Sequence, residues 1–330
     1  LYRDTLGIPM YTSETINYLD SAGGILASHT VPYDTSIAHI GNGVERYQFI
    51  DTITFSTPGE YKAYYTNCCR NAAILNIPNA SAYSMYLDVD IFADSTNSSP
   101  VFLNEPITVA QLNQPFMYNP LPFDADGDSL SWVLSSPLEL LQGTYGSIIP
   151  GYVLPFSDTL IPFSLDPLTG EISFLPNTIG HFQVSVTAVE WRNGVEIGFI
   201  RRDMQLIVVP SGNTPVMVQA FTSVQRTTTN PIYVNVGESL TFTLTATNLD
   251  SGLPTIAIAG STLLTTTAFA YTTQVSNNEV AAAINWTPML SEVSDKPYYV
   301  SFRVGDYSAP FTFYNDYTFR IIVTNNTTSV

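Results

Sequence analysis

The sequence predicts an all-β protein made of tandem β-sandwich domains, and its residue patterning supports this fold class in two ways. Short runs rich in Val, Ile, Thr, Tyr and Phe alternate with Gly, Pro, Asn and Asp, while helical periodicity is scarce. The 22 prolines lie almost wholly between these runs, where a missing N–H does not interrupt a hydrogen-bonded ladder. A chain of 330 residues is too long for one ordinary sandwich and suits two or three domains.

The β-branched and aromatic runs locate the expected strands. They lie at 47–55, 59–65, 83–92, 130–134, 180–190, 196–209, 239–247, 281–286, 298–304 and 318–323. A further strand is expected at 171–174, after a turn in which Pro167 presets φ and Gly170 accepts a positive φ.

Two polar segments, 94–100 and 210–215, predict domain boundaries, because their prolines cannot continue a central strand. They divide the chain into domains at 1–96, 97–210 and 211–330. In the second and third domains a β-type run and then an acidic turn follow the boundary, so these two domains are expected to be divergent copies of one sandwich. The first domain has comparable strands but lacks a recognisable opening strand.

The charge balance restricts the possible partners. Lys and Arg total 11 against 28 Asp and Glu, which gives a formal net charge of −17. Phosphate backbones and anionic lipid surfaces would repel such a chain, so nucleic-acid binding is excluded as a function, whereas divalent cations would be attracted. No apolar run approaches the roughly 18 residues of a membrane-spanning helix, so direct membrane insertion is not expected.

A candidate cation site lies in the second domain, at Asp124, Asp126 and Asp128 with Gly127 to bend the backbone. Alternating carboxylates of this kind supply the hard oxygen ligands that Ca²⁺ takes. The run begins like an EF-hand loop but has serine where that loop requires Gly at its sixth position and Glu at its twelfth. It fits a turn at the end of a cadherin-like or related sandwich, where a cation stiffens a joint. A solvated acidic turn without an ion is the alternative.

Glu190 and Asn97 are expected to complete this site, because a sandwich brings an early turn and the acidic end of a later strand to one pole. An ion pair of Glu190 with Arg192 or Arg202 is an equal alternative. Asp203 is a further possible ligand, but a local ion pair suits it better because arginines precede it. A weaker metal set is predicted at the second boundary. It consists of Asn213, Asp250 and Asp306.

The two cysteines, Cys68 and Cys69, are adjacent. Free buried thiols are the favoured interpretation, because a disulfide between neighbours closes a strained ring and is rare. A bond to another chain or to a missing segment is the next alternative. The spacing does not match a zinc motif, which needs two more ligands nearby.

Catalysis is not predicted. The three histidines lack the spacing of a zinc hydrolase, and neither a nucleophile elbow nor a phosphate-cradling glycine loop occurs. A pair of carboxylates of the glycosidase type stays compatible with so acidic a sequence. The tryptophans Trp132, Trp191 and Trp286 lie in or beside strands and are expected in cores, with an exposed sugar-binding platform as the alternative.

Several short motifs fall in a familiar order. They are YRD at 2–4 with GIP at 7–9, CCRN at 68–71, NSSPVF at 97–102, DADGDSL at 124–130, LDPLTG at 165–170, VEWRNG at 189–194 and RDMQ at 202–205. In these the chain resembles the gliding-motility-associated and type IX-secreted adhesin-like surface proteins of Bacteroidetes, which carry tandem immunoglobulin-, PKD- or cadherin-like modules. The resemblance covers the chain to about residue 210, and the last third agrees more loosely.

The resemblance implies an extracellular protein that is displayed on a cell or built into a surface filament, without known catalysis. It also implies O-glycan acceptors in the pattern Asp-(Ser/Thr)-apolar. These are Thr5, Ser21, Thr52 and Thr159. The family usually has Cys at the position of Thr5, so its disulfide scheme does not transfer to Cys68 and Cys69.

The function expected from the sequence is structural or adhesive, with Ca²⁺ at the joints between domains. Partners would be other copies of the chain or neighbouring domains of a longer one. A sandwich without its opening strand leaves an unpaired edge, which a strand of another copy could complete, so a polymerising subunit is predicted. A module that binds surface glycans or a partner cell is the alternative.

Overall fold

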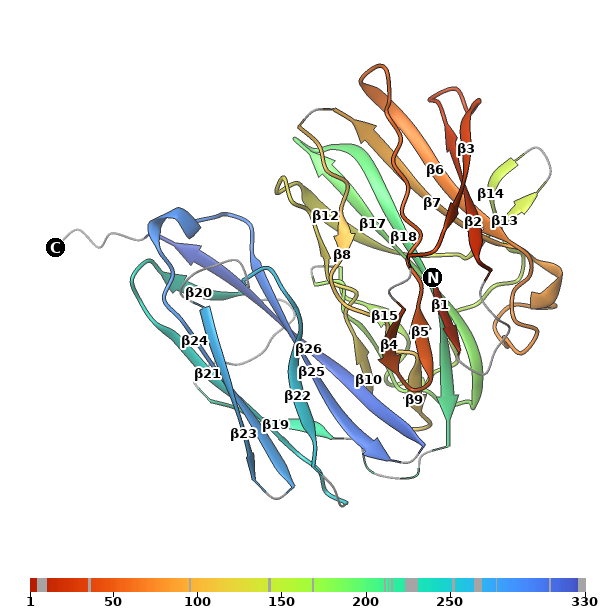
Figure 1. Cartoon of the computed structure of the whole chain (residues 1–330). Coiled ribbons are helices and arrows are strands. Elements are labelled where there is room, and N and C mark those ends of the chain that lie inside the picture. Colours follow the sequence, from red (N-terminus) through yellow and green to blue (C-terminus); the bar gives the residue numbers. More distant parts are fainter. Residues whose placement is uncertain are drawn as a thin grey trace. The chain divides into compact units, whose positions relative to one another are not determined.

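A computed structural model of the protein describes residues 1–4, 11–34, 37–94, 96–141, 144–167, 169–210, 212, 214, 216–222, 231–250, 253–263, 269–276, 278–308 and 310–325. These residues form strands, connecting turns and two short 3-10 helices, η1 (Ala80–Ala82) and η2 (Leu290–Glu292) (Figure 1). The predicted all-β class is therefore confirmed. None of the helices described is long and apolar enough to cross a membrane.

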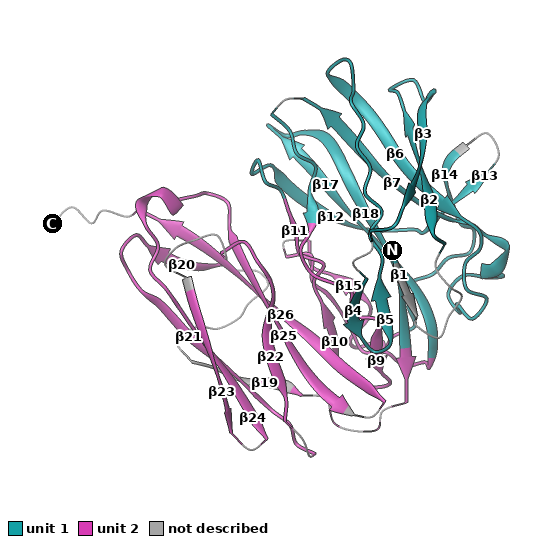
Figure 2. Ribbon diagram, in the orientation of Figure 1, with its two compact units in different colours: residues 1–101, 124–156, 180–207 teal, residues 102–123, 157–179, 208–330 magenta. Residues whose placement is uncertain are grey.

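The chain folds into two compact units, and each is assembled from three separate segments (Figure 2). Unit 1 contains residues 1–101, 124–156 and 180–207, and unit 2 contains residues 102–123, 157–179 and 208–330. This division differs from the three consecutive domains at 1–96, 97–210 and 211–330. The residues expected to form the second domain are shared between both units.

Unit 1 is built around one large sheet, and a small sheet lies at the chain's beginning. The large sheet runs in the order β12-β17-β18-β7-β6-β2-β3, with β13 paired to β14 and β7, and the small one in the order β1-β5-β4. The strands of unit 1 are β1 (Tyr2–Asp4), β2 (Ser13–Leu19), β3 (Ile25–Pro32), β4 (Ala38–Gly41), β5 (Val44–Arg46), β6 (Gly59–Asn67), β7 (Met85–Ala93), β12 (Ser129–Ser135), β13 (Leu138–Leu141), β14 (Thr144–Ile148), β17 (Gly180–Arg192) and β18 (Val195–Val209), whose last two residues belong to unit 2.

The pairing of β18 with β7 explains why the boundary at 96/97 was wrong. The two strands are antiparallel, with Phe199 opposite Asp90 and Ile200 opposite Val89. Strand β18 thereby covers the edge that β7 would otherwise expose, so one sheet includes strands from both predicted domains. The edge of β7 is therefore paired within the chain.

Unit 2 contains a sandwich of two four-stranded sheets, in the orders β19-β21-β24-β23 and β20-β26-β25-β22. Their strands are β19 (Met217–Thr222), β20 (Ile232–Asn235), β21 (Leu240–Thr247), β22 (Thr255–Ser261), β23 (Phe269–Ser276), β24 (Glu279–Trp286), β25 (Tyr298–Ser308) and β26 (Phe311–Thr324). Shorter strands complete the element list: β8 (Val101–Phe102), β9 (Val109–Gln111), β10 (Phe116–Tyr118), β11 (Pro122–Phe123), β15 (Ser164–Leu165) and β16 (Ile172–Phe174).

The core of unit 2 follows from strand alternation. In β21 every second residue points inward, and Phe242 and Leu244 are fully buried. They pack in one cluster with Trp286 of β24 and with Phe302 and Phe319 of the opposite sheet. The expectation that Trp286 fills a core is thus confirmed, while Trp132 and Trp191 are only partly buried.

Segments 102–123 and 157–179 belong to unit 2 because of buried polar contacts. Asn119 Nδ2 donates to the carbonyl of Thr169 at 2.7 Å and to Oγ1 of Thr318 at 3.0 Å, and all three residues are buried. Met117 N–H donates to the side chain of Asn315 at 2.8 Å. Such buried groups are costly when left unpaired, so these segments depend on β26.

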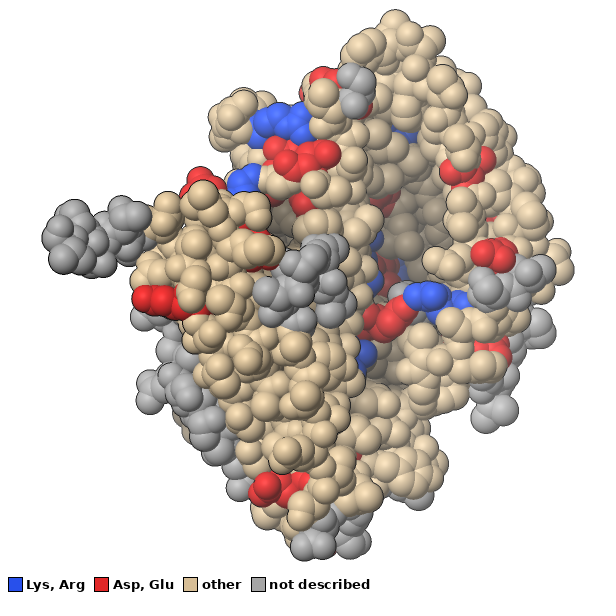
Figure 3. Space-filling model, turned by 60° about the vertical axis from the view of Figure 1, so that its left-hand side comes forward, with Lys and Arg blue, Asp and Glu red and all other residues tan. Residues whose placement is uncertain are grey.

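The predicted strand at 47–55 is wrong. Its apolar residues alternate, and Tyr47 is buried, but the segment is extended chain with a single isolated bridge from Phe49 to Tyr33. The polar strands β2 and β3 were missed, because their Ser, Thr, Asn and His residues lack an apolar face. On the face drawn in Figure 3, charged side chains occupy small separate areas, and most of that face is formed by uncharged residues.

Candidate metal centre

The acidic turn 124–128 lies in unit 1 and is shaped by its first aspartate. Oδ1 of Asp124 accepts the backbone N–H of Asp126 at 3.0 Å and that of Asp128 at 2.8 Å. Gly127 takes a positive φ of 76°, a conformation that costs glycine little. The turn brings one carboxylate oxygen of each of the three aspartates within 4.8 Å of the others, as the sequence predicted for a cation site.

The linker segment before Pro100 is tied to this turn. Ser98 donates its backbone N–H to Oδ2 of Asp126, in a very short contact. The neighbouring Asn97 is half-buried, and its Oδ1 accepts a hydrogen bond from Arg192. Asn97 therefore lies at the acidic turn, where the sequence placed it. All of these residues belong to unit 1, so the turn lies within one unit rather than at a joint between predicted domains.

Glu190 is brought close to this turn by the register of two strands, although its carboxylate is not one of the three whose oxygens lie within 4.8 Å of one another. In the β12–β17 pair, Leu130 lies opposite Glu190, directly after the acidic turn. The Glu190 side chain is fully buried, and none of the described residues donates a hydrogen bond to either of its carboxylate oxygens. A glycine makes room for it: a Cβ built on Gly198 of β18 would lie 3.3 Å from Oε2 of Glu190.

The buried carboxylates have altered proton affinities. Burial, followed by the charges of Asp124 and Asp128, raises the pKa of Glu190 to about 7. A hydrogen bond that protonated Glu190 could share with Asp128 acts in the same direction. Burial also raises the pKa of Asp124, although the backbone N–H of Asp128 opposes this shift. Both shifts mean that burial and neighbouring carboxylates disfavour the ionised forms of Glu190 and Asp124.

Arg192, the last residue of β17, supplies a positive charge at the turn. Its Nε donates to both carboxylate oxygens of Asp128 at 3.1 Å, and its Nη2 donates to Oδ1 of Asn97 at 2.6 Å. The predicted alternative paired Arg192 with Glu190, but the arginine is bonded to Asp128 instead. The contact of Arg192 with the linker was not anticipated from the sequence.

The donor set fits a hard divalent cation. It contains four carboxylates and the amide oxygen of Asn97, against the single charge of Arg192. Oδ2 of Asp124 and both oxygens of Glu190 are buried, and no donor among the described residues reaches them. Buried charges in proteins are normally paired or coordinate metals. Ca²⁺ accepts carboxylate and amide oxygens in flexible geometry, so it is the ion that these residues suit best.

The second predicted set, at Asp250 and Asp306, repeats the arrangement with less charge. Oδ1 of Asn248 accepts the N–H of Asp250 at 2.9 Å, and Oδ2 of Asp250 accepts the N–H of Thr214 at 2.5 Å. Nδ2 of Asn248 donates to the buried Asp306 at 2.8 Å. An amide therefore replaces the first aspartate of the acidic turn. Asn213, the third predicted ligand, lies outside the described residues.

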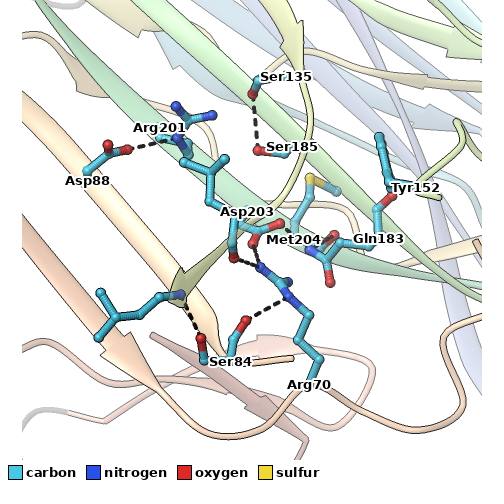
Figure 4. A network of polar contacts seen from close by, with 12 residues as sticks. Arg70, Ser84, Asp88, Ser135, Tyr152, Gln183, Ser185, Arg201, Asp203 and Met204 are labelled. Carbon is cyan, nitrogen blue, oxygen red and sulfur yellow. Dashed lines mark hydrogen bonds and ion pairs between the residues drawn. The ribbon is translucent and has the colours of Figure 1, made fainter. Parts of the chain in front are cut away.

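Asp203 belongs to a different polar network inside unit 1 (Figure 4). Its Oδ2 accepts a hydrogen bond from Nη2 of Arg70 at 2.8 Å, and both side chains are almost fully buried. Gln183 donates to its other oxygen, and Arg70 also donates to the carbonyls of Ser84 and Leu138. The prediction of an ion pair is right in kind, but the partner comes from a distant strand connection rather than from the adjacent arginines.

The remaining predicted positions lie on the surface. Ser21, Thr52 and Thr159 are exposed, as glycan acceptors must be, and Thr5 falls outside the described residues. Cys68 and Cys69 are exposed and joined to one another. The interpretation as free buried thiols is therefore wrong for this structure.

No protein-family model matches the chain, and no curated protein matches it. Similar solved structures include the N-terminal eight Ig domains of Down Syndrome Cell Adhesion Molecule, with 9% identity, coverage of 95% of this chain and 37% of that chain, and a TM-score of 0.26. The sialic acid binding region of a Streptococcus sanguinis SK1 adhesin has 14% identity, coverage of 70% and 79%, and a TM-score of 0.25. Cadherin-like domains 1 to 4 of zebrafish RET have 12% identity, coverage of 86% and 64%, and a TM-score of 0.23. Similarity at this level does not assign a function.

Proposed function

We propose that the protein is a non-catalytic adhesive or structural module of a cell surface, and that unit 1 binds Ca²⁺ at the acidic turn. The ligands are Asp124, Asp126, Asp128 and Glu190, with Asn97 from the linker. The observation that carries the proposal is Glu190, whose carboxylate is fully buried without a donor among the described residues. Isolated buried charge of this kind is costly unless a cation balances it.

Calcium would supply charge neutralisation at a point where three parts of unit 1 meet. The linker contributes Asn97, the turn contributes its aspartates, and β17 contributes Glu190. Without a divalent ion the carboxylates of the turn and of β17 repel one another, and with it all three parts would bind the same ion. A stiffened unit is what an extended surface protein requires.

The bacterial surface assignment, with type IX secretion, self-association and O-glycans on Ser21, Thr52 and Thr159, is the finer part of this proposal. It rests on the sequence motifs, and the three acceptor side chains are accessible. Intact mass measurement of protein isolated from its native source would detect attached glycans.

A glycan- or partner-binding role is the second candidate, and a groove in unit 1 favours it. The groove has a volume of about 400 Å³, and its lining includes Tyr61, Tyr145, Asp90 and Glu196. Aromatic rings can pack against the apolar C–H face of a sugar, and neighbouring carboxylates can accept hydrogen bonds from its hydroxyl groups. Binding of a glycan array by the wild type but not by a Tyr145→Ala variant would support this role.

Calorimetric titration with CaCl₂, together with thermal unfolding with and without chelator, tests the calcium site. Wild type should bind one ion at the turn. At an ion concentration 100 times its Kd, the ion should stabilise the fold by about 2.7 kcal/mol. Asp124→Asn should abolish binding yet stay folded, because its Oδ1 still accepts the turn N–H groups. Its amide could donate to Glu190, as Asn248 donates to Asp306.

Asp295→Asn is the matched control, since it removes the same charge from an exposed position in unit 2. It should bind calcium like wild type. A wild-type protein that takes up no calcium and melts identically in chelator would contradict the proposed function.

A further inference from the structure

Arg192 occupies oxygens that the proposed calcium site needs. Its guanidinium is bonded to both carboxylate oxygens of Asp128 and to Oδ1 of Asn97. These are two of the five proposed ligand residues. The Arg192 side chain is 27% exposed, so its guanidinium can move into solvent when its bonds to Asp128 and Asn97 are broken.

A guanidinium and a calcium ion compete for these oxygens. The arginine donates N–H groups along the same lone pairs that a cation would take, and both carry positive charge. The exchange is nevertheless favoured by charge, because the single charge of Arg192 faces Asp124, Asp126, Asp128 and Glu190. A divalent ion at the turn would also attract the buried oxygens of Asp124 and Glu190, which receive no hydrogen bond from Arg192 or from any other described residue.

The similar turn in unit 2 has fewer acids and lacks the arginine. Where the first copy has Asp124 and Asp128, the second has Asn248 and Gly252. Two residues after the buried acid, the first copy has Arg192 and the second has Ser308. An arginine is thus present beside the turn with three aspartates in unit 1, and a serine takes its place beside the less acidic turn in unit 2.

We propose that Arg192 is a tethered cation that competes with Ca²⁺ for Asp128 and Asn97, and that it thereby sets the calcium concentration at which the site fills. This inference rests on the proposed calcium site and adds its regulation. Binding of the ion releases the guanidinium, and removal of the ion lets it return. The turn is in this way held together at low calcium, and the ion must displace a resident partner before it binds.

The test is calcium affinity by titration calorimetry on the full chain, in wild type, Arg192→Gln and Arg192→Lys. Because the arginine makes charge-assisted, bidentate bonds that binding must break, Arg192→Gln should bind calcium about tenfold more tightly. Arg192→Lys keeps the charge but loses the planar fork, so its gain should be smaller. Lys296→Gln is the control for net charge, because it removes one exposed positive charge in unit 2, and its affinity should equal that of wild type.

A second readout needs no variant. The Nε–H resonance of Arg192, observed by NMR in the wild-type protein, should move on calcium addition towards the position of a solvent-exposed arginine and return on chelation. A purely structural arginine would keep its resonance. This measurement decides the matter even where Arg192→Gln fails to fold.

The outcomes separate the two proposals. If neither wild type nor Arg192→Gln binds calcium, the proposed function itself is wrong. If both bind with equal affinity, or the variant binds more weakly, the calcium site stands and the competition by Arg192 is overturned. An unmoved Nε–H signal in calcium-saturated wild type would overturn it as well.

Discussion

Glu190 shows how strand register can bury a carboxylate for which no described residue supplies a donor. Its backbone is fixed in the β12–β17 ladder, so the carboxylate cannot leave the interior without breaking strand pairing. Its counterpart in unit 2, Asp306, is satisfied by the amide of Asn248. The two turns therefore differ in how they accommodate a buried acid: Asp306 has an internal donor, and Glu190 has none among the described residues.

The raised pKa of Glu190 predicts how stability depends on pH when chelator is present. Its folded-state pKa of about 7 lies above its ordinary value of 4.5, so the folded state binds the proton more tightly. The stabilising contribution is complete below the ordinary pKa and is lost as pH rises through about 7. Glu190→Gln should remove this dependence and be about 1 to 2 kcal/mol more stable than wild type at pH 8, a value reduced for solvent screening.

Urea unfolding at pH 5 and pH 8 in chelator measures the effect. The informative quantity is the difference between wild type and variant at each pH, because Asp124 also has a raised pKa and titrates in both proteins. Equal differences at both pH values would contradict the assignment.

The aspartates of the site could be predicted because they lie within one turn, where spacing alone brings them together. Glu190 could be anticipated from its place at the end of a strand. The pairing of Arg192 with Asp128 could not be predicted. Residues 190 and 192 point to the same face of β17 and both approach the turn, so the sequence does not show which acid the arginine meets. Which acid receives the guanidinium depends on strand register, and register is set by long-range pairing.

At the scale of elements, β18 is the strand that joins the predicted first and second domains. Gly198 permits the close approach, since a Cβ at this position would lie 2.7 Å from the backbone oxygen of Asp90 on β7. Such a distance cannot be relieved by moving a flexible side chain. The glycine therefore belongs to the strand pairing as much as to the metal centre.

Gly198→Ala should destabilise the protein by about 1 to 3 kcal/mol, because the methyl group forces β18 away from β7. Amide hydrogen exchange should quicken at Val89 and Ile200, which lie opposite one another in this pair. Gly194→Ala in the same hairpin is the comparison, because nothing lies within 4 Å of its Cβ and only its positive φ is strained. Unchanged exchange at β7 and β18 in Gly198→Ala would show that the contact tolerates a side chain.

Strands with strong alternation were predicted well, and their pairing was not. The runs that became β17, β18, β21 and β24 have an apolar face that periodicity identifies. Nothing in the sequence of β7 marks it as a partner of β18, because the ladder is formed by backbone groups that every residue carries. The segment 47–55 has alternating apolar residues but forms only one isolated bridge, so its residue pattern alone wrongly predicted a strand.

At the scale of the whole molecule, the predicted boundary at 210/211 lies inside unit 2, shortly after the chain enters that unit at Val208. Residues 102–123 and 157–179 precede it and yet belong to unit 2. Their buried contacts, such as that of Asn119 with Thr318, connect them to the strands that follow it. Polar composition indicated a boundary near residue 210 but could not show which earlier segments unit 2 requires.

A protease site inserted between Pro210 and Ser211 tests this organisation. After cleavage of the purified chain, the two fragments should elute together in gel filtration, because unit 2 contains parts of both. In urea they should separate, with loss of the near-ultraviolet signal of buried Trp286. Fragments that elute separately while each stays folded would contradict the division into these units.

The six segments of the two units alternate along the chain, so the polypeptide passes between them five times. Genetic recombination exchanges contiguous stretches of sequence. A crossover at either polar segment would separate parts of the chain that fold together in one unit. The hybrid would then combine segments from two parents that did not evolve to pack against one another. This protein is therefore constrained to evolve by substitution within an inherited whole, not by the shuffling that disperses self-contained modules among surface proteins.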